Sequence, residues 1–242
     1  MYAIKTNDLS RCYGDVTAVD KLNLEVREGE IFALLGVNGA GKTTAIKMLS
    51  CLSKATSGSA TVGGHDISKE GDKIKRIIGV SPQETAVAPN LTVKENLELI
   101  AGLHGFTKER RAARVNEITG EFKLGDILKR KAGRLSGGWQ RRLSIAMALI
   151  SEPRILFLDE PTLGLDVIAR SELWDTIRAL KDKVTIILTT HYMEEAEALS
   201  DRIGIMNSGR LLVTGSAKEL CDMCGVDKFE DAFIRIVREG VK

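Results

Sequence analysis

The 242-residue sequence predicts an α/β protein built on a mostly parallel β-sheet. Continuous apolar runs, of the kind that form strands buried on both faces, alternate with segments long enough to be helices. These runs cover residues 31–35, 155–158 and 184–188. Each leads directly into polar residues, and in sheets of this kind ligands bind at the carboxyl ends of the strands. A binding site at that edge of the sheet is therefore expected.

Two other regions depart from this pattern. Residues 16–27 alternate between apolar and polar side chains, and residues 59–62 form a short β-type run beside two glycines, which predicts an antiparallel sheet next to the core. Residues 92–150 offer no good strand. Thr92 and Glu95 form a capping-box pattern, and Ser136 is a candidate N-cap for a helix that runs to about Ile150. A helical insert is predicted here. The apolar residues of its first helix recur every three to four positions, which predicts one apolar face made by Val93, Leu97, Ile100 and Leu103.

Composition and charge exclude several function classes. The net charge is only +2, from 35 basic and 33 acidic residues, so no nucleic-acid partner is expected. No apolar stretch reaches the roughly 20 residues that cross a bilayer, and the N-terminus lacks a signal-peptide hydrophobic region, so the chain is expected in the cytoplasm unless a membrane partner holds it. Cys221 and Cys224 have CxxC spacing without a second pair nearby, which favours reduced thiols over a zinc or redox site.

A glycine-rich loop follows the first buried run. Residues 36–44 read GVNGAGKTT and match the phosphate-loop pattern, with a strand before and a helix after. Backbone N–H groups of such a loop surround a β-phosphate, and the following helix directs its positive end toward the same anion. Lys42 would contact the β- and γ-phosphates and Thr43 would bind Mg²⁺. The residues expected to bind ATP are Gly36, Asn38, Gly39, Gly41, Lys42, Thr43 and Thr44.

Two carboxylates lie where the second buried run ends. Asp159 is suited to hold Mg²⁺, directly or through water. Glu160 is the next residue, so its side chain points away from Asp159 and can act as a general base toward an attacking water. An acidic turn after a strand is common, but beside a phosphate loop the pair predicts nucleotide hydrolysis.

The segment Leu135-Ser-Gly-Gly-Trp-Gln140 resembles the LSGGQ signature of ABC ATPases, and it precedes the acidic strand as in that family. Gln83 resembles the Q-loop glutamine, residues 163–166 the D-loop, and His191 the switch histidine. Tyr13 stands where the family has an aromatic residue that stacks on adenine. The resemblance covers essentially the whole chain, with all motifs in the family's order.

This resemblance implies a P-loop NTPase core of the RecA-like type with an antiparallel β subdomain and a helical subdomain. Residues 1–83 and 152–242 would form the core with its antiparallel part, and residues 84–151 the helical subdomain. The signature residues Ser136 and Gly138 would bind the γ-phosphate of ATP held by a second copy of the chain, so a two-fold dimer would complete both sites. His191 would contact the γ-phosphate, Gln83 would link Mg²⁺ and water to the helical subdomain, and Asp166 of the D-loop would contribute to the nucleotide site.

Two positions depart from the family's commonest pattern. Trp139 replaces a polar or smaller signature residue, and we expect it to pack within the helical insert rather than contact nucleotide. Gly164 stands where many D-loops have serine, while Asp166 is retained. Ser136 and Gly138 are intact, so the ATPase activity itself is still expected.

The leading functional hypothesis is the motor subunit of an ABC transporter, a Mg²⁺-dependent ATPase that drives a separate integral membrane permease from the cytoplasmic face of the membrane. The alternative is a soluble ABC ATPase acting on DNA or ribosomes. Family members that act on DNA resemble this chain but carry a long coiled coil between the phosphate loop and the signature, and this sequence has none. A third class is a regulatory nucleotide sensor that binds ATP without hydrolysing it. Such proteins often lack the general base, so the presence of Glu160 argues against this class. The phosphate loop, the segment after Thr190 and the C-terminal segment 229–233 look most similar to ABC-2 type exporters. The expected permease contact is at residues 81–105.

Overall fold

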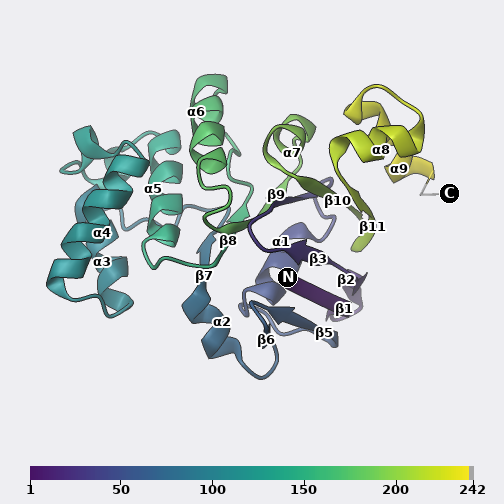
Figure 1. The fold of residues 1–242 in the computed structure, drawn as a ribbon, viewed down its shortest axis with the longest axis horizontal. Helices are drawn as coiled ribbons and strands as arrows, with labels where there is room; N and C mark the ends of the chain where they lie inside the picture. The colour runs from purple at the N-terminus through teal and green to yellow at the C-terminus, as the bar shows by residue number, and fades with distance from the viewer. Residues whose placement is uncertain (240–242) are drawn as a thin grey trace.

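The computed structural model describes residues 1–239, and its centre is a six-stranded sheet in the order β11-β10-β4-β9-β8-β7 (Figure 1). Five neighbouring strands are parallel, and β11 pairs antiparallel with β10 at one edge. The strands are β4 (Ile31–Leu35), β7 (Ile78–Ser81), β8 (Ile155–Asp159), β9 (Thr185–Thr190), β10 (Arg202–Asn207) and β11 (Arg210–Gly215). The predicted parallel sheet is confirmed. The strands β7, β10 and β11 were not predicted.

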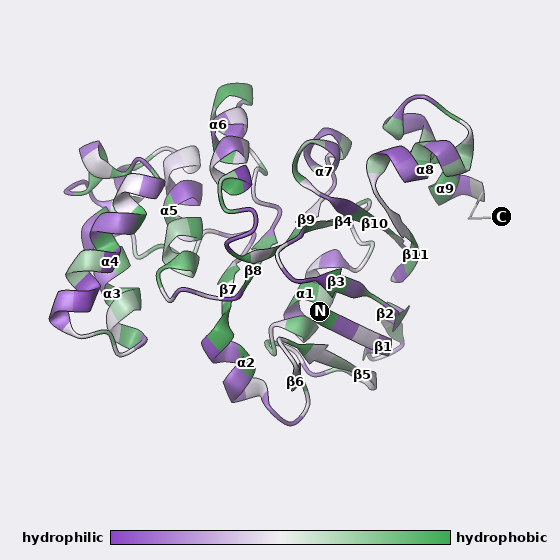
Figure 2. Cartoon of the chain, in the orientation of Figure 1, coloured by the Kyte–Doolittle hydropathy of each residue, from purple (hydrophilic) through white to green (hydrophobic). Residues whose placement is uncertain are grey.

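The central strands are buried on both faces because hydrophobic layers cover the sheet on each side. In β4, alternate residues belong to different cores: Ile31, Ala33 and Leu35 face one, and Phe32 and Leu34 face the other. Every residue of β4, β8 and β9 is buried. Continuous apolar runs are the sequence signature of such strands, and Figure 2 shows β8 in the hydrophobic colour.

A second, five-stranded sheet supplies one of these covering layers. Its order is β2-β1-β5-β6, with β3 pairing β1, and all of its pairings are antiparallel. Its strands are β1 (Tyr2–Tyr13), β2 (Val16–Leu22), β3 (Glu25–Arg27), β5 (Ser57–Val62) and β6 (His65–Asp66). The predicted antiparallel part is present, but its longest strand, β1, was missed. The pairing of β1 changes register near Leu9 and Arg11, which breaks the alternation along that strand.

The chain between β7 and β8 is helical, as predicted, and forms the group at the left of Figure 1. It contains α3 (Val93–Leu103), α4 (Lys108–Glu121), two 3-10 turns (Gly125–Ile127 and Ala132–Arg134) and α5 (Gly137–Leu149). The capping box of α3 is present, with Thr92 and Glu95 bonding reciprocally. Ser136 stands at the N-cap of α5, but its side chain makes no capping hydrogen bond.

One helix prediction needs correction. The apolar spacing in α3 predicted a single face made by Val93, Leu97, Ile100 and Leu103, but Leu103 is 76% exposed. Asn96 is fully buried instead, because its amide bonds the backbone of the preceding loop at Ala88 N and O. Burial on this helix is therefore set partly by a polar contact to the loop and not by hydrophobicity alone.

The other helices cover the sheets or end the chain. They are α1 (Lys42–Leu49), α2 (Gly71–Ile77), α6 (Val167–Arg178), α7 (Met193–Leu199), α8 (Ala217–Cys224) and α9 (Phe229–Glu239). Phe229, Ala232 and Ile236 bury one face of α9 against α8, α7 and β10. Cys221 and Cys224 are half-buried free thiols. Among residues 1–239, the helices are all too short or too polar to cross a bilayer.

Candidate nucleotide site

The phosphate loop connects β4 to α1 and is shaped by close backbone contacts. Gly41 has a φ of 100°, and a Cβ there would lie 2.5 Å from the carbonyl oxygen of Ala18. A Cβ on Gly36 would lie 2.3 Å from the carbonyl oxygen of Met206. Both positions therefore require glycine, since a side chain would displace backbone of neighbouring strands or loops. Behind the loop, the Lys42 ammonium donates to the carbonyls of Gly36 (2.7 Å) and Val37 (3.2 Å).

An open cavity of about 580 Å³ lies at the carboxyl end of the parallel sheet, where the sequence placed a binding site. It brings together residues from the antiparallel sheet, the phosphate loop, the start of α1 and three loops that follow strands β7, β8 and β9 of the parallel sheet. Its lining comprises Tyr13, Ala18, Asn38, Gly39, Ala40, Gly41, Lys42, Thr43, Thr44, Gln83, Glu160, Leu163 and His191. Most of the predicted ATP-binding and catalytic residues thus surround a single space.

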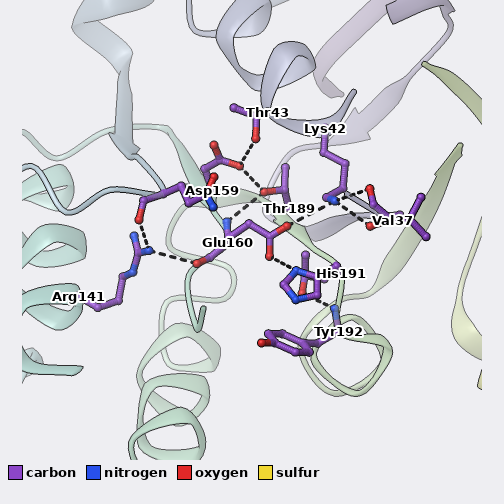
Figure 3. Close-up of polar contacts among 12 residues, drawn as sticks. Val37, Lys42, Thr43, Arg141, Asp159, Glu160, Thr189, His191 and Tyr192 are labelled. Atoms are coloured by element: carbon purple, nitrogen blue, oxygen red, sulfur yellow. Dashed lines mark hydrogen bonds and ion pairs between the residues drawn. The ribbon is translucent and has the colours of Figure 1, made fainter. Parts of the chain in front are cut away.

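A cluster of side-chain oxygen atoms lies beside this cavity. The Thr43 hydroxyl donates to Asp159 Oδ1 at 3.0 Å, and the Thr189 hydroxyl donates to the same oxygen at 2.6 Å (Figure 3). Mg²⁺ prefers oxygen ligands and commonly uses one or two carboxylates together with substrate phosphates and water. The donor set of Thr43 and Asp159, with Gln83 lining the same cavity, fits that requirement.

Glu160 lies between Lys42 of the phosphate loop and His191, the residue that follows β9. Its Oε1 is 3.4 Å from Lys42 Nζ, and its Oε2 is 2.7 Å from His191 Nδ1 (Figure 3). Because a carboxylate only accepts hydrogen bonds, Nδ1 of His191 carries the hydrogen of that contact. The Glu160 side chain is 7% exposed, so these interactions are poorly screened by water. The arrangement joins a cation, a proton acceptor and an imidazole at one point.

Two more ionisable side chains are buried near this cluster. Arg141 of α5 is 4% exposed, and Glu195 of α7 is fully buried. Burial raises the pKa of Glu195, against the opposing hydrogen bonds from Thr190, Thr162 and Trp174. Burial also lowers the pKa of Arg141, while the carboxylates of Asp159, Glu195 and Glu160 act in the opposite direction.

Several predicted site residues lie outside the cavity. Ser136 and Gly138 are at the start of α5, apart from the phosphate loop of the same chain. The Asp166 carboxylate accepts from Ala169 N at 2.9 Å and so caps α6. Tyr13 does line the cavity, with the Arg11 guanidinium 4.4 Å from the centre of its ring.

The two departures from the signature and D-loop pattern have structural correlates. Trp139 is partly buried against the core and lies 4.9 Å from the Arg142 guanidinium, as expected for a packing residue. Gly164 has a φ of 75°, a conformation that glycine adopts without strain.

Two residues that hold the site together were not predicted. Thr189 bonds both Asp159 and the backbone N–H of Glu160, the latter at 3.0 Å. Arg141 bonds the carbonyl oxygens of Pro82 (2.6 Å) and Glu160 (3.3 Å). A signal for Arg141 was available, because it lies in a helix that is otherwise mostly apolar after its first turn.

The chain is similar to known ATP-binding proteins along its length. Residues 19–163 match the family described as ABC transporter. The daunorubicin resistance ATP-binding protein DrrA3 of Streptomyces coeruleorubidus is 41% identical, over 94% of this chain and 72% of that protein. The linearmycin resistance ATP-binding protein LnrL of Bacillus subtilis is also 41% identical, over 93% of this chain and 72% of that protein.

The fold agrees with these relationships. A dimeric ATP-binding cassette, solved in a post-hydrolysis state with ADP and Pi, superimposes with a TM-score of 0.78 at 27% identity, over 88% of this chain and 98% of that one. The relatives do not favour the alternative of an ATPase acting on DNA or ribosomes. With the phosphate loop, acidic strand end and signature all present in this fold, the chain belongs to the ABC transporter family, as an ATP-binding subunit that hydrolyses ATP.

Proposed function

We propose that two copies of this chain enclose two ATP molecules and that their closure drives a membrane exporter from the cytoplasmic face of the membrane. The observation that carries the proposal is the separation of two phosphate-binding elements. The phosphate loop lines the cavity with Glu160 and His191, whereas Ser136 and Gly138 lie outside it. A two-fold dimer can bring each signature segment to the partner's cavity, so that both sites are completed together.

The predicted site residues then have defined roles. Lys42 supplies positive charge to the β- and γ-phosphates, and Asn38 and the loop glycines supply backbone contacts. Glu160 accepts the proton of the attacking water, and His191 holds the γ-phosphate. Tyr13 stacks on adenine. Ser136 and Gly138 contact the γ-phosphate across the dimer, and Asp166 acts at the same interface.

Mg²⁺ bound beside these residues would neutralise charge that develops on the phosphates during hydrolysis. Thr43 and Asp159 are the proposed ligands, with Gln83 contributing from the Q-loop. The oxygen-only donor set supports this ion over zinc or copper, which take nitrogen and sulfur ligands readily. Thr189 fixes the Asp159 carboxylate through its 2.6 Å hydrogen bond.

The permease would contact residues 81–105, which span the end of β7, the loop carrying Gln83 and the start of the proposed helical subdomain of residues 84–151. A second cavity of about 270 Å³ supports this location, since it is mostly apolar and lies between α5, β7 and α3. Its lining includes Leu52, Ala86, Ile100 and His104, and Leu52 is 65% exposed. Leu99 and Leu103 of α3 are also exposed. An apolar groove with an exposed rim suits a helix from a membrane partner. Because the relatives are named for drug resistance, the proposed cargo is a drug-like molecule moved outward.

Mixed dimers test the composite site. A Ser136→Ala chain combined with a Lys42→Ala chain should contain one intact site, because the intact phosphate loop of one faces the intact signature of the other. If Ser136 acted on the ATP of its own chain, both sites of the mixed dimer would be damaged. We expect labelled nucleotide to occupy one site per purified mixed dimer, with measurable turnover. Turnover at the background of the two parent variants would overturn the composite arrangement.

A further inference from the structure

Arg141 makes an unusual set of contacts for a buried arginine. Its guanidinium donates to the carbonyl oxygens of Pro82 (2.6 Å), Gln83 (2.5 Å) and Glu160 (3.3 Å). All three acceptors are backbone atoms, and among the described side chains of residues 1–238 no carboxylate lies within ion-pair distance of Arg141. A guanidinium stays charged and carries five donors in a rigid fork. It can therefore bridge two separate loops at once, one carrying Gln83 and the other carrying Glu160.

The backbone of Glu160 requires such support. Its φ is 49°, in the left-handed region that residues with a Cβ rarely occupy. Strained conformations of this kind persist where neighbouring groups hold them. The N–H of Glu160 donates to the hydroxyl (3.0 Å) and carbonyl (3.2 Å) of Thr189, and its C=O accepts from Arg141. Both polar groups of the residue are thus fixed, one from β9 and the other from α5 (Figure 3).

The same face of α5 contacts the end of β7 a second time. The Ser144 hydroxyl, three residues after Arg141, is 3.0 Å from the Ser81 hydroxyl, and both serines are buried. Residues three apart on a helix lie on one face. The helix that starts at the signature segment is therefore attached to the strand end and the loop leading to Gln83 at two successive points.

We propose that Arg141 is a positioning residue for hydrolysis, which ties the Gln83 loop to Glu160 and holds the Glu160 carboxylate at the cavity. This inference rests on the proposed roles of Glu160 and Gln83. A displacement of α5 or of the Gln83 loop moves the atoms that hold the Glu160 carbonyl. Arg141 thereby transmits the position of the helical segment to the carboxylate without touching ATP.

The test compares Arg141→Gln, Arg141→Lys and the control Arg114→Gln in full-length protein. Arg114 is a matched control because its side chain is 11% exposed and donates to the Leu149 and Ile150 carbonyls, away from the cavity. Supporting groups of this kind commonly contribute about 10–100-fold to activity. We expect Arg141→Gln to lower kcat by that factor, with the Kd for ATP unchanged. Arg141→Lys should also lower kcat, since one ammonium cannot span both loops, whereas Arg114→Gln should keep it.

A double substitution separates this inference from the proposed function. If Arg141 acts through Glu160, adding Arg141→Gln to Glu160→Gln should cause no further loss in single-turnover hydrolysis. A normal rate for Glu160→Gln alone would contradict the proposed function. A slow Glu160→Gln variant together with normal kcat in Arg141→Lys, or with fully additive losses, would overturn only the inference. If Arg141→Gln does not fold, the lysine variant carries both measurements.

Discussion

The sharpest prediction concerns Glu160→Gln. The amide keeps the size of the side chain but cannot take a proton from water as a carboxylate does. Loss of a general base commonly slows a reaction by about 10²–10⁴-fold, which corresponds to about 3–5 kcal/mol of transition-state stabilisation. The variant should still bind ATP, because the phosphate loop and Tyr13 are untouched, and it should accumulate as an ATP-bound dimer.

The structure also gives the expected effect on stability. Removing one partner of a buried ion pair usually destabilises by about 3–5 kcal/mol. Here Lys42 keeps two carbonyl acceptors, at 2.7 and 3.2 Å, and the amide of the variant can still bond His191. We therefore expect a smaller loss, about 1–2 kcal/mol in the nucleotide-free protein. Bound phosphates would supply the missing negative charge, so ATP should raise the melting temperature more in the variant than in the wild type.

Three measurements check this reasoning. Phosphate release gives the rate, size-exclusion chromatography with ATP gives the dimer fraction, and thermal unfolding with and without ATP gives the stabilisation. Glu152→Gln is the matched control, since its carboxylate pairs with Arg110 at the surface, far from the cavity. A wild-type rate for Glu160→Gln would mean that another group is the base. A slow variant that no longer binds ATP would mean that Glu160 shapes the cavity and would not support its role as base.

Three further predictions address the phosphate lysine, the buried glutamate and the partner surface. Lys42→Ala should reduce ATP hydrolysis to near background, because the phosphates lose their cation; wild-type turnover would contradict the site, and the exposed Lys73→Ala is the control. Glu195→Gln should become more stable relative to the wild type as pH rises. Burial raises the pKa of Glu195 above its ordinary 4.5, so the folded wild type holds a proton that the unfolded chain releases. The free energy of unfolding of the wild type therefore falls as pH rises above 4.5, whereas the amide does not titrate. Thermal unfolding from about pH 5 to about pH 8 measures this, and a pH-independent difference between the two proteins would refute it. Glu84→Lys and Thr85→Trp should abolish co-purification with a co-expressed permease while basal ATPase activity is kept; if permease binding survives both changes, the contact lies elsewhere.

The sequence alone determined the parts of this protein that are local. The phosphate loop is contiguous, and its glycines, lysine and threonine act within one strand–turn–helix unit, so spacing was enough to locate it. The buried strands β4, β8 and β9 were also predictable, since a strand covered on both faces must be apolar throughout. Strands β1 and β10 gave weaker signals, because β1 carries charged residues and register shifts and β10 begins with a charged arginine.

Tertiary structure decided how distant residues meet. Glu160 contacts Lys42 and His191 only because β4 and β8 lie on the two sides of β9 in the sheet, an order that the sequence does not state. The burial of Asn96 in place of Leu103 depended on a loop that folds back over α3. The contacts of Arg141 could not be predicted from residue spacing, because its partners are backbone carbonyls, which every residue type supplies. The sequence pattern identifies the reactive side chains, whereas tertiary packing determines which backbone atoms hold those side chains in position.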